Sequence, residues 1–107
     1  MLIELGNLKG AVMKINLEFL GLPIVSDLVG QKKLELNVSG TTVKDVIDEL
    51  VNRYGKKVRD AFYDTEGNFD LMIQIALNGK SLIPPEKHNI SLNEGDTLVF
   101  MLLLGGG

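Results

Sequence analysis

Apolar and polar residues alternate along several short stretches of the chain, and this period of two predicts β-strands with one buried face. The first stretch runs from Lys14 to Leu20, where Ile15, Leu17 and Phe19 are the apolar positions. Similar alternation predicts four more strands, at residues 34–38, 71–77, 80–83 and 97–103. Asn78-Gly79 separates two of these strands and is the dipeptide that two-residue hairpin turns prefer.

One segment has a helical period instead. Between Val43 and Tyr54, apolar residues recur every three or four positions and form one stripe. Thr42 is a natural N-cap with Asp45 three residues later, and Gly55 supplies a left-handed stop. The pattern therefore predicts a helix over 43–54 that buries its apolar stripe. Residues 24–30 are compatible with a short loop or a single helical turn, and residues 56–63 with a short second helix.

The order of these elements predicts the fold. Two strands, the amphipathic helix and three more strands give one sheet with a helix on one face. The first and last strands are both rich in apolar residues and are too far apart in sequence for a short turn to join them. Placing them side by side and parallel at the sheet centre buries both. We therefore expect an α+β fold of the β-grasp (ubiquitin-like) type, a mixed sheet of about five strands covered by one main helix.

The length of 107 residues predicts a single domain, which we divide into three parts. Residues 1–12 have weak periodicity and form a leader, which is a disordered arm, an alternative start or a remnant of cloning. Residues 13–104 form the β-grasp domain. Gly105, Gly106 and Gly107 form a flexible C-terminal tail.

Composition narrows the function classes. The chain has no cysteine, which excludes disulfides, thiolate metal sites, iron–sulfur clusters and a thiol catalyst. Its net charge of −3 gives no basic surface for nucleic acid. No apolar run approaches the length of about eighteen residues that a membrane-spanning helix needs. The first residues also lack the basic start and apolar stretch of a secretory signal, so we expect a cytoplasmic protein.

The end of the chain carries the strongest functional signal. The apolar last strand runs almost directly into Gly105-Gly106-Gly107. Residues without side chains can thread a narrow tunnel and deliver the terminal carboxylate of Gly107 to the active site of another protein. The alternative is a linker or a remnant of cloning. The bulky strand that leads into the glycines, with no serine between, argues against that alternative.

Several short motifs occur in a defined order between Met13 and Gly107. They are the helix entry at Thr41-Thr42-Val43, the Asn78-Gly79 hairpin, the Gly95-Asp96-Thr97 turn, the apolar last strand and the terminal Gly106-Gly107. In this combination the chain resembles the MoaD/ThiS family of ubiquitin-like sulfur carriers and is closest to the small subunit of molybdopterin synthase. It departs from the molybdopterin carriers just before the diglycine. There they commonly have a Pro-Pro pair and a small residue, and this chain has Leu102-Leu103 and Gly105.

The resemblance implies a carrier or non-catalytic small subunit rather than an enzyme. An E1-like adenylyltransferase of the MoeB/ThiF type would use ATP to adenylate the carboxylate of Gly107, and sulfur transfer would convert the adenylate to a thiocarboxylate. A synthase large subunit of the MoaE type, or a thiazole synthase, would then take the sulfur. The chain itself would bind no cofactor. The segment 56–70 resembles the helix-bearing insertion of the larger carriers, which favours biosynthesis of molybdopterin, the molybdenum or tungsten cofactor.

Three other functions remain open. A thiamine-pathway sulfur carrier would use the same chemistry. A ubiquitin-like protein modifier would be adenylated in the same way and then joined to lysines, and the leucines before the glycines resemble those of ubiquitin itself. A β-grasp binding module would not use the tail. An independent enzyme is the weakest interpretation, because the sequence shows no nucleophile–base pair, phosphate loop or metal cluster.

Alternation along the last strand predicts a surface for a protein partner. If Leu98, Phe100 and Leu102 face the helix, the residues between them face outward. An outward apolar strip favours protein binding, and its predicted members are Val99, Met101, Leu103 and the following Leu104. The alternative is that the leader or the segment 56–70 covers this face.

His88 is the only histidine and lies in the proline-rich loop 84–90. No other metal-binding residues are grouped with it in the sequence, so we expect a surface residue and assign no metal or catalytic site to it.

Overall fold

A computed structural model describes residues 12–102 of the chain. The strands are β1 (Val12–Leu20), β2 (Lys33–Ser39), β3 (Ile73–Leu77), β4 (Ser81–Leu82) and β5 (Thr97–Leu102). The helices are α2 (Pro23–Val29), α3 (Val43–Tyr54) and α4 (Lys56–Phe62), with a short 3-10 helix, η1, at Pro85–Lys87. Of the predicted leader, only Val12 is among the described residues, and it is the first residue of β1.

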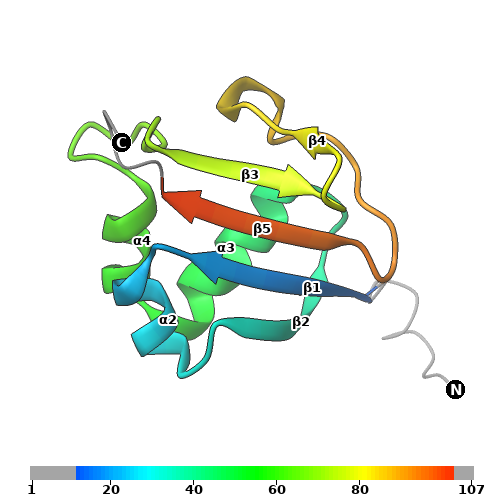
Figure 1. Cartoon of the computed structure of the whole chain (residues 1–107), viewed down its shortest axis with the longest axis horizontal. Coiled ribbons are helices and arrows are strands. Elements are labelled where there is room, and N and C mark those ends of the chain that lie inside the picture. Colours follow the sequence, from blue (N-terminus) through cyan, green and yellow to red (C-terminus); the bar gives the residue numbers. More distant parts are fainter. Residues whose placement is uncertain (1–11, 103–107) are drawn as a thin grey trace, which may run out of the picture.

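The five strands form one mixed sheet in the order β2-β1-β5-β3-β4. β1 and β5 lie side by side and parallel at its centre, and all other neighbours are antiparallel. Figure 1 shows these two strands pointing the same way in the middle of the sheet. This arrangement is the β-grasp fold that the sequence predicts. It places two strands rich in apolar residues where neighbours shield both of their edges.

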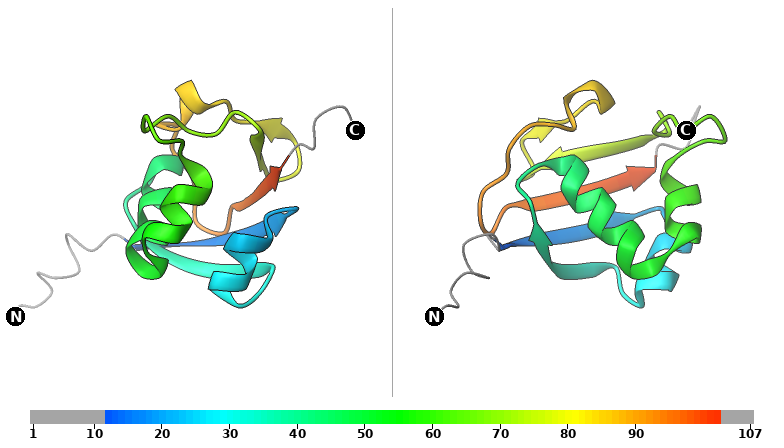
Figure 2. Two further views of the ribbon diagram at one scale, coloured as in Figure 1. Left: turned by 90° about the vertical axis from the view of Figure 1, so that its left-hand side faces the viewer. Right: turned by 180° about the vertical axis from the view of Figure 1, so that it is seen from behind.

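α3 lies on one face of the sheet, α2 and α4 pack at the end where β1 and β5 finish, and the other face has no helical cover (Figures 1 and 2). α3 has the predicted bounds because its N-terminus is closed by a capping box. The Asp45 N–H donates to the Thr42 hydroxyl at 3.1 Å, and the Asp45 carboxylate accepts from the Thr42 N–H at 3.0 Å. Reciprocal bonds of this kind satisfy helix donors that have no partner within the helix.

The core lies between the sheet and the helices and is joined by aromatic side chains. The Phe100 ring of β5 lies 5.7 Å from the ring of Phe19 and 5.3 Å from that of Phe62. Phe69 stacks on Phe62 with 6.0 Å between the ring centres. Because Phe62 is the last residue of α4, these contacts fasten α4 and the segment after it to the central strands.

The predicted strand at 71–77 is two residues too long. β3 begins at Ile73 because Leu71 and Met72 form a turn with Asp70. The predicted hairpin at Asn78-Gly79 is confirmed, since these residues have φ of 53° and 70°, as the turn requires. Within residues 12–102, no helix is both long enough and apolar enough to span a membrane.

Candidate functional site: the outer face of the sheet and the end of β5

β5 begins at a turn held by the Gly95-Asp96-Thr97 motif. The Asp96 carboxylate accepts hydrogen bonds from the Asn93 N–H at 2.8 Å and from the Asn78 side-chain amide at 3.0 Å. The Asn78 side-chain oxygen accepts from the Thr97 N–H at 2.8 Å. The motif that supports the family resemblance therefore has a structural role, which is to join the start of β5 to the β3–β4 hairpin.

The predicted orientation of β5 is confirmed where it can be checked. Leu98 and Phe100 are fully buried against the helices, whereas Val99 and Met101 are half-buried and lie on the opposite face. Leu102 is also half-buried and packs at the margin of the core. Residues 103–107 of the candidate site, which include Leu103, Leu104 and the three glycines, lie outside the described residues.

Neighbouring strands widen the apolar surface beyond the two predicted residues. Met101 is paired with Leu20 of β1, and Val99 with Ala76 of β3. Leu82 of β4 pairs with Ala76 and extends the same row. We call these five residues the outer apolar strip. Leu20 is 42% exposed and Leu82 is 59% exposed.

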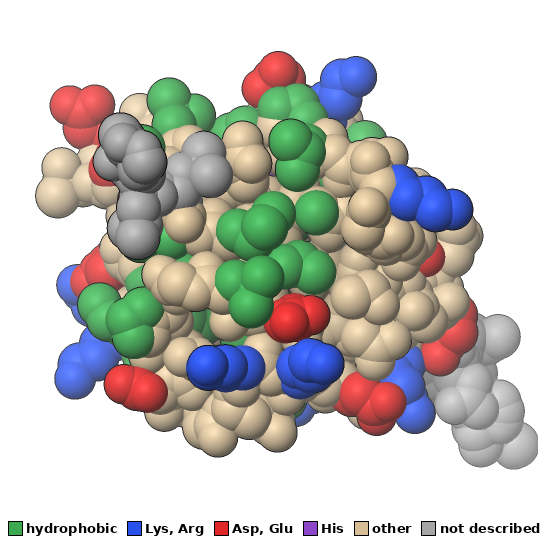
Figure 3. Space-filling model, viewed as in Figure 1, with side chains coloured by type: hydrophobic (Ala, Val, Ile, Leu, Met, Phe, Trp, Pro, Cys, Tyr) green, Lys and Arg blue, Asp and Glu red, His purple; other side chains and the backbone are tan. Residues whose placement is uncertain are grey.

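Figure 3 shows apolar side chains gathered over the middle of this face, with lysine, arginine and acidic side chains around them. Among the described residues, neither the segment 56–70 nor any helix covers the strip (Figure 2). An apolar centre with a charged margin is the usual composition of a surface that binds another protein.

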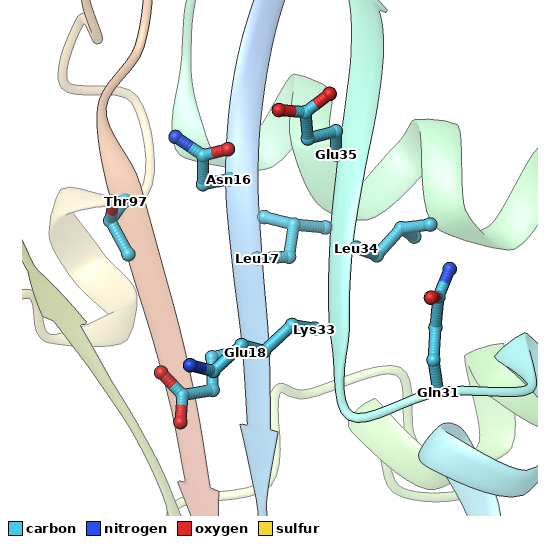
Figure 4. Close-up of a pocket in the computed structure, with 8 residues that line it drawn as sticks. All are labelled: Asn16, Leu17, Glu18, Gln31, Lys33, Leu34, Glu35 and Thr97. Carbon is cyan, nitrogen blue, oxygen red and sulfur yellow. The ribbon is translucent and has the colours of Figure 1, made fainter.

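One side of the strip borders a polar hollow of about 590 Å³ over β1 and β2. Figure 4 shows Asn16 and Glu18 from β1, Lys33 and Glu35 from β2, and Thr97 from β5 around it. Glu18 and Lys33 are directly paired residues of the two strands. Within residues 12–102, neither forms an ion pair with another residue, so both charges are available at the margin of the strip.

His88 is not at the surface, and that expectation is wrong. The residue is 9% exposed, and its ring packs edge-on against Phe69 with 4.7 Å between the ring centres. Its Nε2 atom is buried and has no hydrogen-bond partner among the described residues. Burial lowers the pKa of His88, and the nearby Glu86 carboxylate offsets only part of that effect. The backbone explains its position, since the His88 carbonyl accepts from the Lys44 N–H at 2.8 Å and ties the loop to α3.

No group of three or more metal-binding side chains occurs within the described part of the chain. The sequence prediction also missed Leu20, Ala76 and Leu82 as members of the strip. Leu20 and Ala76 occupy outward positions of their strands in the alternation pattern. Only the register between strands shows that they adjoin Val99 and Met101.

Comparison with known proteins supports the assignment of the fold. Small archaeal modifier protein 1 from Haloferax volcanii is 19% identical, with a TM-score of 0.69 over 88% of this chain and 99% of that chain. A structure of the BexX/CysO complex from Amycolatopsis orientalis matches at 20% identity and a TM-score of 0.63, over 87% and 99% of the two chains. A proposed molybdopterin converting factor, subunit 1, from Pyrococcus furiosus matches at 20% identity and a TM-score of 0.55, over 86% and 99%.

None of the curated protein sequences matches this chain significantly. The model of the ThiS family, in contrast, matches residues 24–107, which include α3, all strands except β1, and the glycine tail. This chain therefore belongs to the ThiS family and has its ubiquitin-like β-grasp fold.

Proposed function

We propose that this protein is a sulfur carrier that acts through the carboxylate of Gly107. In this proposal an E1-like adenylyltransferase uses ATP to form an acyl-adenylate at Gly107 with release of pyrophosphate, and a sulfur nucleophile at the sulfide level then displaces AMP to give a thiocarboxylate. The observation that carries the proposal is that the ThiS family match continues through β5 to the terminal glycines. β5 lies at the centre of the sheet and ends five residues before Gly107, so a rigid domain supports the tail.

The outer apolar strip supports a role for this face in binding partner proteins. We propose that Val99 and Met101, together with Leu103 and Leu104, contact the adenylyltransferase and afterwards the enzyme that takes the sulfur. The chain would contribute no catalytic side chain and bind no cofactor. Its chemistry would consist of presenting a terminal carboxylate on side-chain-free residues.

We favour the molybdopterin pathway, with a MoaE-type large subunit as the second partner. Two observations support it. One similar structure is a proposed molybdopterin converting factor subunit. In addition, α4 lies within the segment 56–70 that resembles the insertion of the larger carriers. Conjugation to lysines is the second candidate, because the similar Haloferax protein is named a modifier.

Intact mass measurement of protein isolated from its own host tests the proposal. A carrier is expected to contain a fraction of molecules in which sulfur replaces one oxygen, and a modifier is expected to give conjugates of higher mass. A variant that lacks Gly106 and Gly107 should show neither product and should not support cofactor synthesis. The truncation should leave the free energy of unfolding unchanged, since it lies beyond β5. Full restoration of cofactor synthesis by the truncated variant would rule the proposal out.

A further inference from the structure

A turn beside the end of β5 presents two large apolar side chains to solvent. Leu71 is 77% exposed and Met72 is 42% exposed, and they are adjacent in the chain. Together with Asp70 they form what we call the Leu71 turn. Adjacent apolar side chains with this exposure are unfavourable in water and add nothing to the core, which suggests that they serve contact with another molecule.

The Leu71 turn is held in one conformation. The Asp70 carboxylate accepts from the Met72 N–H at 2.9 Å, and the Asp70 carbonyl accepts from the Ile73 N–H at 3.0 Å. The Asp70 N–H itself donates to the Phe62 carbonyl at 2.8 Å, which fixes the turn to the end of α4. The side chains of the turn are therefore presented from a preorganised backbone, which lowers the entropy lost on binding.

The position of the turn connects it to the tail. Ile73, the residue after the turn, pairs with Leu102 at the end of β5. Figure 1 shows the start of β3 and the tip of β5 at the same end of the sheet. Five residues separate Leu102 from the end of the chain, and at about 3.4 Å each they reach at most about 17 Å. A protein that binds Gly107 in its active site must therefore approach this end of the sheet closely.

The chemistry around the turn indicates what such a partner offers. A hollow of about 600 Å³ beside the turn is lined by the apolar residues Phe69, Leu71 and Pro85 and by the polar residues Asp64, Asn68 and Asp70. Within residues 12–102, neither carboxylate forms an ion pair. A complementary surface has an apolar pocket for Leu71 and a basic side chain next to it.

We propose that the Leu71 turn is a second anchor, separate from the outer apolar strip, for the adenylating enzyme that receives the tail. Leu71 and Met72 enter an apolar pocket at the mouth of that enzyme's active site, and a lysine or arginine at its rim lies against Asp64 and Asp70. The anchor sets the distance and direction from which residues 103–107 enter the site. This inference rests on the proposed function, because it assumes that an adenylating partner binds Gly107.

The test compares Leu71→Asp with Val12→Asp in ATP–pyrophosphate exchange by the adenylating enzyme from the same genome. Val12 is 54% exposed and begins β1, at the end far from the tail, so both variants place the same charge at a solvent-exposed apolar site. We expect Leu71→Asp to raise the KM for the carrier about tenfold, the usual loss for a buried interface anchor, and Leu71→Ala to give a smaller rise. Val12→Asp should match the wild type. Circular dichroism and thermal unfolding of each variant confirm that it is folded.

The wild type and the variant without Gly106 and Gly107 complete the experiment. If the wild type supports exchange, the truncated form does not, and Leu71→Asp behaves like Val12→Asp, the anchor is overturned and the carrier function stands. If the wild type supports no more exchange than the truncated form, the proposed function itself fails. Sedimentation analysis tests the alternative that a second copy of this chain binds the Leu71 turn. A wild-type dimer that Leu71→Asp converts to a monomer would assign the turn to self-association and overturn the proposal.

Discussion

His88 shows how the local sequence and the final environment of one residue can differ. Its neighbours are prolines and charged residues, and this composition is typical of an exposed loop. The loop nevertheless folds back, because its carbonyl at His88 accepts from the first turn of α3 and its ring packs against Phe69. These contacts place the imidazole where protonation is unfavourable. Its burial lowers its pKa below the ordinary value of 6.5.

The lowered pKa predicts a specific pH dependence of stability. Between the lowered pKa and about 6.5, the unfolded chain binds more protons at His88 than the folded chain does, so the free energy of unfolding falls as the pH falls. From pH 7.5 to pH 5.5, the wild type should lose stability that a His88→Leu variant does not lose. Urea denaturation at both pH values measures this difference. An equal pH dependence in the two proteins would contradict the prediction.

The same pH experiment separates His88 from the carboxylates. The pKa of Asp45 is lowered, chiefly by the hydrogen bond from the Thr42 backbone. Its contribution to stability is therefore present above its ordinary value of 3.8 and is lost as the pH falls through its lowered pKa. That window lies below pH 4, so it does not overlap the range in which His88 titrates.

At the scale of elements, the start of β5 is held in place by hydrogen bonds to the hairpin that follows β3. The side chain of Asn78 lies in the hairpin turn, and it bonds both the Asp96 carboxylate and the Thr97 N–H. The Asn16 N–H of β1 also donates to the Asp96 carbonyl at 2.9 Å. The turn before β5 is thus fixed from β1 on one side and from the β3–β4 hairpin on the other. This attachment sets the register that places Val99 and Met101 on the outer face.

Substitution of Asp96 tests this role. Asp96→Ala removes two hydrogen bonds to a carboxylate, and we expect the free energy of unfolding to fall by about 1–3 kcal/mol. Asp96→Asn keeps a single acceptor oxygen and should lose less. Asp27 is exposed on α2 and its side chain has no hydrogen bond within residues 12–102, so Asp27→Ala is the control and should stay within about 0.5 kcal/mol of the wild type. Equal stability of Asp96→Ala and the control would show that the network contributes nothing.

At the scale of the whole molecule, one face of the sheet packs in the core and the other face is exposed. The helices bury one face and provide the stability of the domain, so the outer face is available for binding. β5 belongs to both faces, because Leu98 and Phe100 point into the core while Val99 and Met101 point outward. A partner that binds the outer face therefore contacts β5, the strand that precedes the tail in the chain.

Met101→Asp tests the outer apolar strip. A charge in the centre of an apolar interface should weaken binding to the adenylating enzyme by about tenfold or more. The free energy of unfolding should change by less than about 1 kcal/mol, since the side chain does not enter the core. Asn52→Asp introduces the same charge at an exposed position of α3, behind the sheet, and should bind normally. Titration by calorimetry measures both affinities, and unchanged binding of Met101→Asp would exclude the strip from the interface.

The sequence alone determined the elements whose signals are local, and through them the fold. The helix at 43–54 has its apolar stripe, cap and stop within a few residues of one another, and the Asn78-Gly79 turn requires only its own backbone conformation. The apolar content of the first and last strands was sufficient to pair them at the sheet centre. The same alternation assigned Val99 and Met101 to the outer face.

Tertiary structure decided the features that depend on contacts between distant segments. Leu20 and Leu82 join the strip only through strand register, and His88 is buried only because its loop bonds to α3. The proposed role of the Leu71 turn depends on the pairing of Ile73 with Leu102, which places the turn beside the end of β5. Periodicity reports which face of its own element a residue occupies, whereas the neighbours of that face depend on how separate elements pack together.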